Sequence, residues 1–122
     1  MFSGMKKSSL KKATEVCKAV ANGDFEARIT NITETGDAAE LMHAINLLID
    51  RTDAYLRESK ACLDYVSRNQ HFRLIAEKGM VGSFKAAARS INTATWSIKE
   101  RHDGFCNLAS DFESRLKDVV QS

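Results

Sequence analysis

Residues 38–67 read AAELMHAINLLIDRTDAYLRESKACLDYVS, a stretch of thirty residues that contains neither Gly nor Pro. Its apolar and small side chains recur in steps of three and four, which is the spacing of a coiled-coil helix. The recurring positions are Leu41, Ile45, Leu48, Thr52, Tyr55, Ser59, Cys62 and Val66. A second column repeats at every seventh residue and consists of Met42, Ile49, Leu56 and Leu63. The apolar face is therefore wide enough for a bundle of about four helices.

As a single helix, this stretch has a length of about 45 Å at ~1.5 Å per residue. One compact small domain does not need so long a helix. We therefore predict that two successive modules share it, and that the chain is all-helical.

The composition is that of an ordinary soluble protein, with 122 residues, 28% charged and 43% hydrophobic. No apolar run reaches the roughly 18 to 20 residues of a membrane span, and the first twelve residues are too polar for a signal peptide. We therefore expect no membrane span and a cytoplasmic location. A net charge of +2 gives no argument for binding nucleic acid.

The sequence offers no set of residues for catalysis or metal binding. Cys17, Cys62 and Cys106 lie 45 and 44 residues apart, with no C-x-x-C pair, so we expect buried thiols in a reducing compartment. The sequence has no nucleophile motif and no phosphate loop, so we expect no enzyme activity. We expect neither cofactor nor metal. A helical cofactor sensor that uses His71 or His102 is a less favoured alternative.

The first seventy residues have a helix-connector-helix pattern. Leu10, Ala13, Cys17 and Val20 predict a short amphipathic helix, which Asn22 and Gly23 end. A connector then runs from Gly23 to Gly36, with three apolar side chains that we expect to pin it to the helices, namely Phe25, Ile29 and Ile32. Because antiparallel neighbours usually need only about two to eight connecting residues, this longer connector allows two parallel helices.

The same pattern returns after residue 68, with a second connector from Asn69 to Gly82. An offset of 46 residues superposes Val20 on Val66, Ile29 on Ile75, Gly36 on Gly82, Ile45 on Ile91 and Asn46 on Asn92. A third apolar column then recurs at Phe84, Ala87, Ile91, Ala94, Ile98, Arg101, Phe105, Leu108, Phe112, Arg115 and Val119. This pattern is still running at Ser122, so we expect a further helical output domain beyond it.

At these residues the sequence resembles the HAMP domain, a module that links input to output in bacterial chemoreceptors and sensor kinases. Gly23-Asp24-Phe25 matches the Gly-Asp-Phe signature that ends the first helix of that family, and Asn46 matches its second-helix Asn. The chain departs at the D-E-x-G motif, where it has Gly36-Asp37-Ala38-Ala39, and at residues 69–71, where Asn-Gln-His replaces Gly-Asp-Phe.

The wording is also similar to cytoplasmic methyl-accepting chemotaxis proteins with paired HAMP units, at residues 23–29, 41–59 and 79–92. The resemblance implies a first unit at residues 8–58, a divergent second unit at 59–100, and the start of a coiled coil at 101–122. It also implies that each unit is a parallel four-helix bundle in a homodimer. The output region would engage the CheA kinase and the CheW adaptor.

Two sets of residues are the candidates for this role. The signalling and structural set is Gly23, Asp24, Phe25, Ile29, Ile32, Asp37, Asn46, Ile75, Gly82 and Asn92. The dimer-core set is Cys17, Leu41, Ile45, Leu48, Tyr55, Cys62, Val66, Ile91 and Ile98. We expect Asp24 to accept hydrogen bonds from backbone donors, Asp37 to favour a helix start, and each Asn to bond a connector carbonyl or its symmetric mate.

The functional prediction is a signal relay in a chemotaxis transducer. The same module in front of a histidine kinase or a diguanylate cyclase is the first alternative. A histidine phosphotransfer bundle is another, and it would be a monomer with antiparallel helices.

Overall fold

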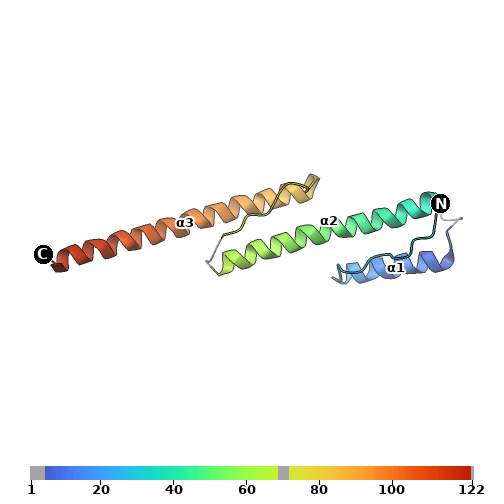
Figure 1. Ribbon diagram of the computed structural model, residues 1–122, viewed down its shortest axis with the longest axis horizontal. Coiled ribbons are helices and arrows are strands. Elements are labelled where there is room, and N and C mark those ends of the chain that lie inside the picture. Colours follow the sequence, from blue (N-terminus) through green and yellow to red (C-terminus); the bar gives the residue numbers. More distant parts are fainter. Residues whose placement is uncertain (1–4, 69–71, 122) are drawn as a thin grey trace. The chain divides into compact units, whose positions relative to one another are not determined.

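The computed structural model describes residues 5–68 and 72–121, and within these ranges it has three helices and no strand (Figure 1). The helices are α1 (Lys7–Ala21), α2 (Gly36–Ser67) and α3 (Gly82–Gln121). The predicted all-helical class is confirmed, and α2 runs without a break through the stretch that the heptad pattern marks. Contacts divide the chain into a first unit, Met1–Ala54, and a second unit, Tyr55–Ser122, so α2 contributes residues to both.

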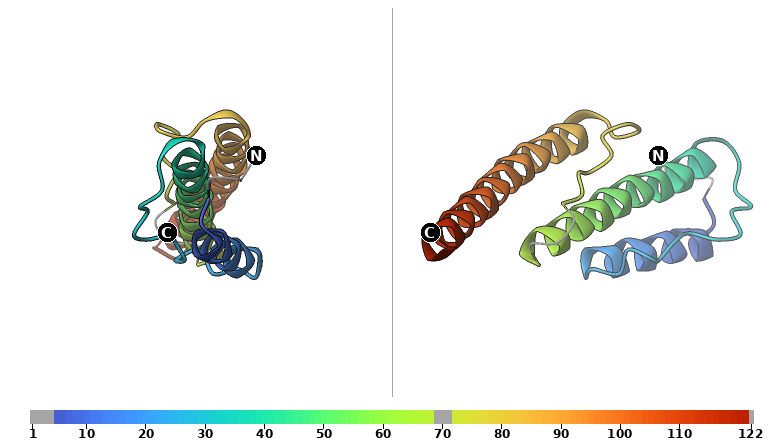
Figure 2. Two further views of the ribbon diagram at one scale, coloured as in Figure 1. Left: turned by 90° about the vertical axis from the view of Figure 1, so that its right-hand side faces the viewer. Right: turned by 60° about the vertical axis from the view of Figure 1, so that its left-hand side comes forward.

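In the first unit, α1 and α2 run parallel and side by side, and the connector at residues 22–35 passes back along them (Figures 1 and 2). The reversal begins at Gly23, whose φ of 97° lies in the left-handed region. The amide of Gly23 donates to the Val20 carbonyl and the amide of Asp24 donates to the Ala19 carbonyl, both at 2.9 Å. These two bonds form a Schellman motif and end α1 where the sequence predicts.

The first unit has a small core that all three of its segments share. Ala13 of α1, Ile29 of the connector and Met42 of α2 form its buried cluster. The half-buried side chains that pack against it are Met5, Val16, Ile32 and Ile45. The expected apolar face of α1 is partly wrong, because Leu10 and Cys17 are exposed while Ser9 and Ala13 are buried. The inward side of α1 is thus about one residue away from the predicted seam.

The second unit repeats the arrangement with the end of α2, a connector described for residues 72–81, and α3. Its buried cluster joins Cys62 of α2, Ile75 of the connector and Ala88 of α3. The rings of Tyr55 and Phe84 lie 5.8 Å apart beside it. The predicted departure at residues 69–71 lies outside the described residues.

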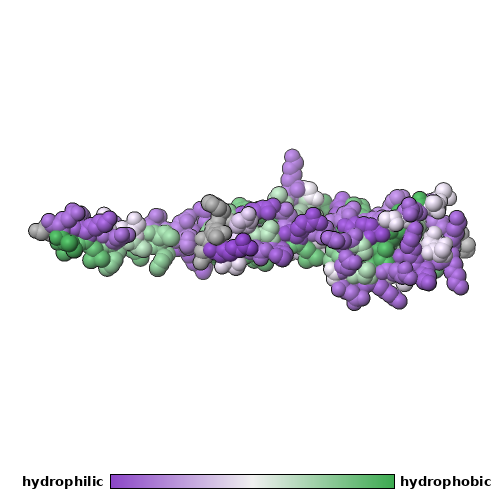
Figure 3. Space-filling view, turned by 60° about the horizontal axis from the view of Figure 1, so that its bottom comes forward, coloured by the Kyte–Doolittle hydropathy of each residue, from purple (hydrophilic) through white to green (hydrophobic). Residues whose placement is uncertain are grey.

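The C-terminal part of α3 carries a strip of exposed apolar side chains (Figure 3). The strip consists of Phe105, Leu108, Phe112, Leu116, Val119 and Val120, which are 49–82% exposed. A contiguous apolar strip of this kind on a helix marks an interaction surface. Within the described residues, no helix is both long enough and apolar enough to cross a membrane.

Candidate functional site

In each unit, one Asn side chain binds both backbone groups of one connector residue. Asn46 accepts from the Ile29 amide at 2.9 Å and donates to the Ile29 carbonyl at 3.0 Å. Asn92 accepts from the Ile75 amide at 2.7 Å and donates to the Ile75 carbonyl at 2.9 Å. We call each pair a connector clamp, and in both the partners are 17 residues apart.

The clamps meet a physical requirement of the connectors. Ile29 and Ile75 are each only 3% exposed, so their backbone groups are withdrawn from water together with their side chains. A buried backbone group without a partner costs about 1–3 kcal/mol. An extended connector has no neighbouring strand to supply these bonds, and the carboxamide of Asn offers one donor and one acceptor in the required geometry.

Ion pairs add to the clamp in the first unit. The Arg28 Nε lies 2.8 Å from an Asp50 oxygen, and its Nη2 lies 4.0 Å from Asp53. Nη1 of Arg28 donates to the carbonyls of Phe25 and Ala27. The guanidinium therefore ties two connector carbonyls to the acidic face of α2.

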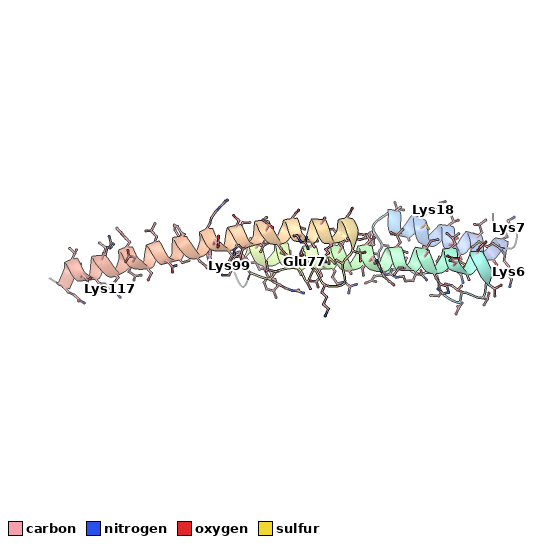
Figure 4. All side chains as sticks on the ribbon, turned by 90° about the horizontal axis from the view of Figure 1, so that it is seen from above. Lys6, Lys7, Lys18, Glu77, Lys99 and Lys117 are labelled. Carbon is pink, nitrogen blue, oxygen red and sulfur yellow. The ribbon has the colours of Figure 1, made fainter. Side chains whose placement is uncertain are left out.

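The second unit uses different charged residues for the same purpose. Arg73 of the connector donates to both carboxylate oxygens of Glu58 at 3.0 Å. Glu77, labelled in Figure 4, accepts from Arg89 at 3.0 Å and from the Asn92 amide at 3.2 Å. Glu77 therefore extends the second clamp, because the Asn92 amide bonds both the Ile75 carbonyl and this carboxylate. The hydrogen bonds from Arg89 and then Asn92 hold the pKa of Glu77 below its ordinary value of 4.5.

The start of α1 is fixed by the end of the first connector. The Glu34 carboxylate accepts from the Ser9 hydroxyl at 2.8 Å and from the Lys6 amide at 3.3 Å (Lys6 is labelled in Figure 4). A carboxylate at this position is favourable because a helix N-terminus carries free amides and a partial positive charge. The Lys12 ammonium donates to the Thr30 carbonyl one turn further along.

The other predicted signalling residues lie on the connectors and at the helix ends. Asp24 accepts a hydrogen bond from the Glu26 amide at 3.1 Å, so it bonds a backbone donor in a local turn. Phe25 is half-buried, and Ile32 packs against the first core. Asp37 lies exposed in the first turn of α2, and Gly82 begins α3 with a φ of 53°.

The predicted dimer-core residues do not share one environment within a single chain. Cys17 is exposed, as are Leu48 at 61% and Ile98 at 37%. Those that are half-buried are Leu41, Ile45, Tyr55, Val66 and Ile91. Ile45 packs against the first core, and Tyr55 and Ile91 pack against the second.

Cys62 corrects the prediction. It is only 1% exposed, and its Sγ lies 3.2 Å from the Thr95 Oγ1 inside its own unit. Its thiol therefore faces α3 of the same chain, so the expected cross-link between two copies of Cys62 is withdrawn. The heptad spacing places Cys62 on an apolar face without saying whether that face meets its own chain or another.

Sequence reasoning missed the ion pairs and the Glu34 contact. Arg28 has no counterpart in the 46-residue repeat, where Leu74 stands, so the internal repeat gave no signal for it. The spacing of Asp50 and Asp53, three residues apart on one side of α2, is a signal that could have indicated a basic partner.

The histidines do not assemble a metal site. Among the described residues, no group of three or more His, Cys, Asp or Glu side chains could hold a metal ion. The His102 ring lies 5.8 Å from the Phe72 ring, and its Nε2 lies 3.7 Å from the Cys106 Sγ. His71, which the cofactor-sensor alternative also names, lies outside the described residues.

A comparison with known proteins finds a relative of matching sequence. The chain is 30% identical, over 113 residues, to a methyl-accepting chemotaxis protein of Paramagnetospirillum magneticum. This chain is related to a chemotaxis protein. The match takes in 93% of the chain but only 25% of the relative, so the chain spans about a quarter of that protein's length. No family model matches the chain, and no solved structure matches it.

Replacing Asn46 by Leu should loosen the first connector, because the Ile29 amide and carbonyl lose both bonds while they stay buried. We expect a loss of about 1–3 kcal/mol in unfolding free energy for each buried group that is left unpaired, measured by urea denaturation. Asn107→Leu, on the exposed part of α3, is the matched control and should leave the free energy nearly unchanged. Equal effects of the two substitutions would contradict the clamp.

The second clamp should weaken in acid. Because the pKa of Glu77 is lower in the folded chain than its ordinary 4.5, its stabilising effect is complete above pH 4.5 and is lost as pH falls through the lowered value. Lys60 also lowers the pKa of Asp64, so the comparison must be made between variants. We expect Glu77→Gln to reduce the acid loss of stability, and Glu113→Gln on α3 to leave it as in the original chain. Identical pH profiles for Glu77→Gln and the original chain would sink this prediction.

Proposed function

We propose that this chain is the tandem HAMP portion of a chemotaxis transducer, which relays a conformational signal and carries out no catalysis. The observation that supports it most directly is the connector clamp, which occurs twice at the same sequence spacing, each time on two parallel helices. The relation to a methyl-accepting chemotaxis protein over 93% of the chain supports the transducer context.

The proposal requires a second copy of the chain. Each unit of one chain supplies two helices, whereas the family's bundle has four. The single chain leaves large apolar side chains uncovered on α2, including Leu48, Leu56 and Leu63, and more on the C-terminal strip of α3. A parallel homodimer would cover both sets and would convert each unit into a four-helix bundle.

The mechanism that we propose is a population shift. Each bundle has two packings of similar free energy, and an input signal favours one of them. Because α2 supplies residues to both units, a change in its packing in the first unit alters the helix on which the second unit is built. The coupling therefore passes along a continuous helix, which is a physical connection rather than a statistical one.

The partners that we propose follow from the transducer context. CheA and CheW would bind an output region outside this chain, and the relay itself would lie in the cytoplasm. The chain contributes the conformational change that such a region receives.

A parallel dimer should place Cys17 of the two copies near each other, because it lies on the predicted seam and its thiol is exposed. We expect mild oxidation to give a Cys17 cross-linked dimer in the Cys106→Ser variant, identified by peptide mass spectrometry, with Cys62 remaining reduced. Cys17→Ser is the control and should give no cross-link. Absence of the cross-link, together with a monomer mass in light scattering, would rule out the dimer.

The relay itself can be tested by hydrogen exchange. We expect Asn46→Leu to change the exchange rates of amides at residues 84–95, in the second unit, by about threefold or more, because α2 couples the units. Asn107→Leu should not change them. If Asn46→Leu affects only the first unit, the two units are independent and the relay proposal fails.

A further inference from the structure

The two units have the same backbone plan but different core residues. Three buried positions of the first unit correspond, 46 residues later, to three buried positions of the second. Ala13, Met42 and Ile49 in the first unit become Ser59, Ala88 and Thr95 in the second. All six side chains are at least nine-tenths buried within their own unit.

These replacements make the second core smaller and more polar. Met42 becomes Ala88, which removes most of a large apolar side chain at a fully buried position. Ile49 becomes Thr95, and the only partner given for its hydroxyl is the Cys62 thiol at 3.2 Å, a weak hydrogen-bonding group. Both changes remove apolar contacts that stabilise the first core.

Ser59 is the clearest difference. Its residue is 9% exposed, and its Oγ is the buried side-chain polar atom without a hydrogen-bond partner among the described residues. Its counterpart Ala13 has no polar side-chain atom to satisfy. A hydroxyl that gives up water without gaining a partner destabilises the packing that buries it.

The connector of the second unit is nevertheless held more extensively than that of the first. Asn92 makes the same two bonds as Asn46 and a third to Glu77, which is itself bound by Arg89. The second unit therefore combines a well-anchored connector with a poorly filled core. Such a unit can change its helix packing while its backbone plan is kept.

We propose that the second unit is the one that repacks when a signal passes, and that the first unit keeps one packing. Ser59, Ala88 and Thr95 are the residues that make it yield. This inference rests on the proposed relay, since it names the part of the relay that moves. A two-state element requires alternative packings of similar free energy, and a weakly filled core brings them together.

Hydrogen exchange of the intact chain tests the inference directly. We expect amides at residues 86–95 of α3 to exchange about tenfold or more faster than those at 40–49 of α2, which occupy the same places in the repeat. Equal rates, or faster exchange at 40–49, would overturn the proposal. Light scattering on the same sample reports the dimer separately, so a monomer would count against the proposed function while the two rates still decide this inference.

Substitution at Ser59 provides the second test. Ser59→Ala gives the second unit the residue that the first has, and we expect it to slow exchange at 86–95 by about fivefold or more, because the unpaired hydroxyl is removed. Ser90→Ala, at an exposed site on α3, is the matched control and should leave the rates unchanged. Faster exchange in Ser59→Ala would show that the hydroxyl has a partner in the assembled protein, and would overturn the proposal. The triple variant Ser59→Ala, Ala88→Met, Thr95→Ile should slow exchange further and reduce the response of the second unit to Asn46→Leu.

Discussion

The structure depends on how an extended connector can be buried without a neighbouring strand. Each connector sends one Ile into a core, which withdraws the backbone of that residue from water. The carboxamide of one Asn then supplies both missing hydrogen bonds, so a single side chain fixes the register of fourteen connecting residues. Without this pairing the connector could not be apolar at that position, and the two parallel helices would lose the segment that packs against both.

Much of this arrangement could be predicted from the sequence. Gly23 marks the end of α1 because few other residues tolerate its backbone conformation, and the matched positions of Asn46 and Asn92 indicated a common structural role. The environment of Cys62 could not be predicted, because a wide apolar helix face has two adjacent columns and spacing alone does not say which one meets the same chain. The pairing of Arg28 depends on a long flexible side chain whose reach is set by the folded connector.

The two units show which features of this plan are fixed and which can vary. Both retain the clamp, the parallel helices and a buried connector Ile. The ion pairs differ, with Arg28 in one and Arg73 and Glu77 in the other, and so do the core side chains. Backbone hydrogen bonds thus define the architecture, while side-chain volume and polarity set how firmly each unit holds it. A relay made of two such units can have parts of unequal rigidity without any change of fold.

The shared use of α2 has a genetic consequence. The repeat of 46 residues begins and ends within a helix, so the closing helix of one copy is also the opening helix of the next. An in-frame duplication of that length therefore adds one complete unit and creates no new loop. Arrays of any number of units can grow in this way, with each added copy free to accumulate its own core residues.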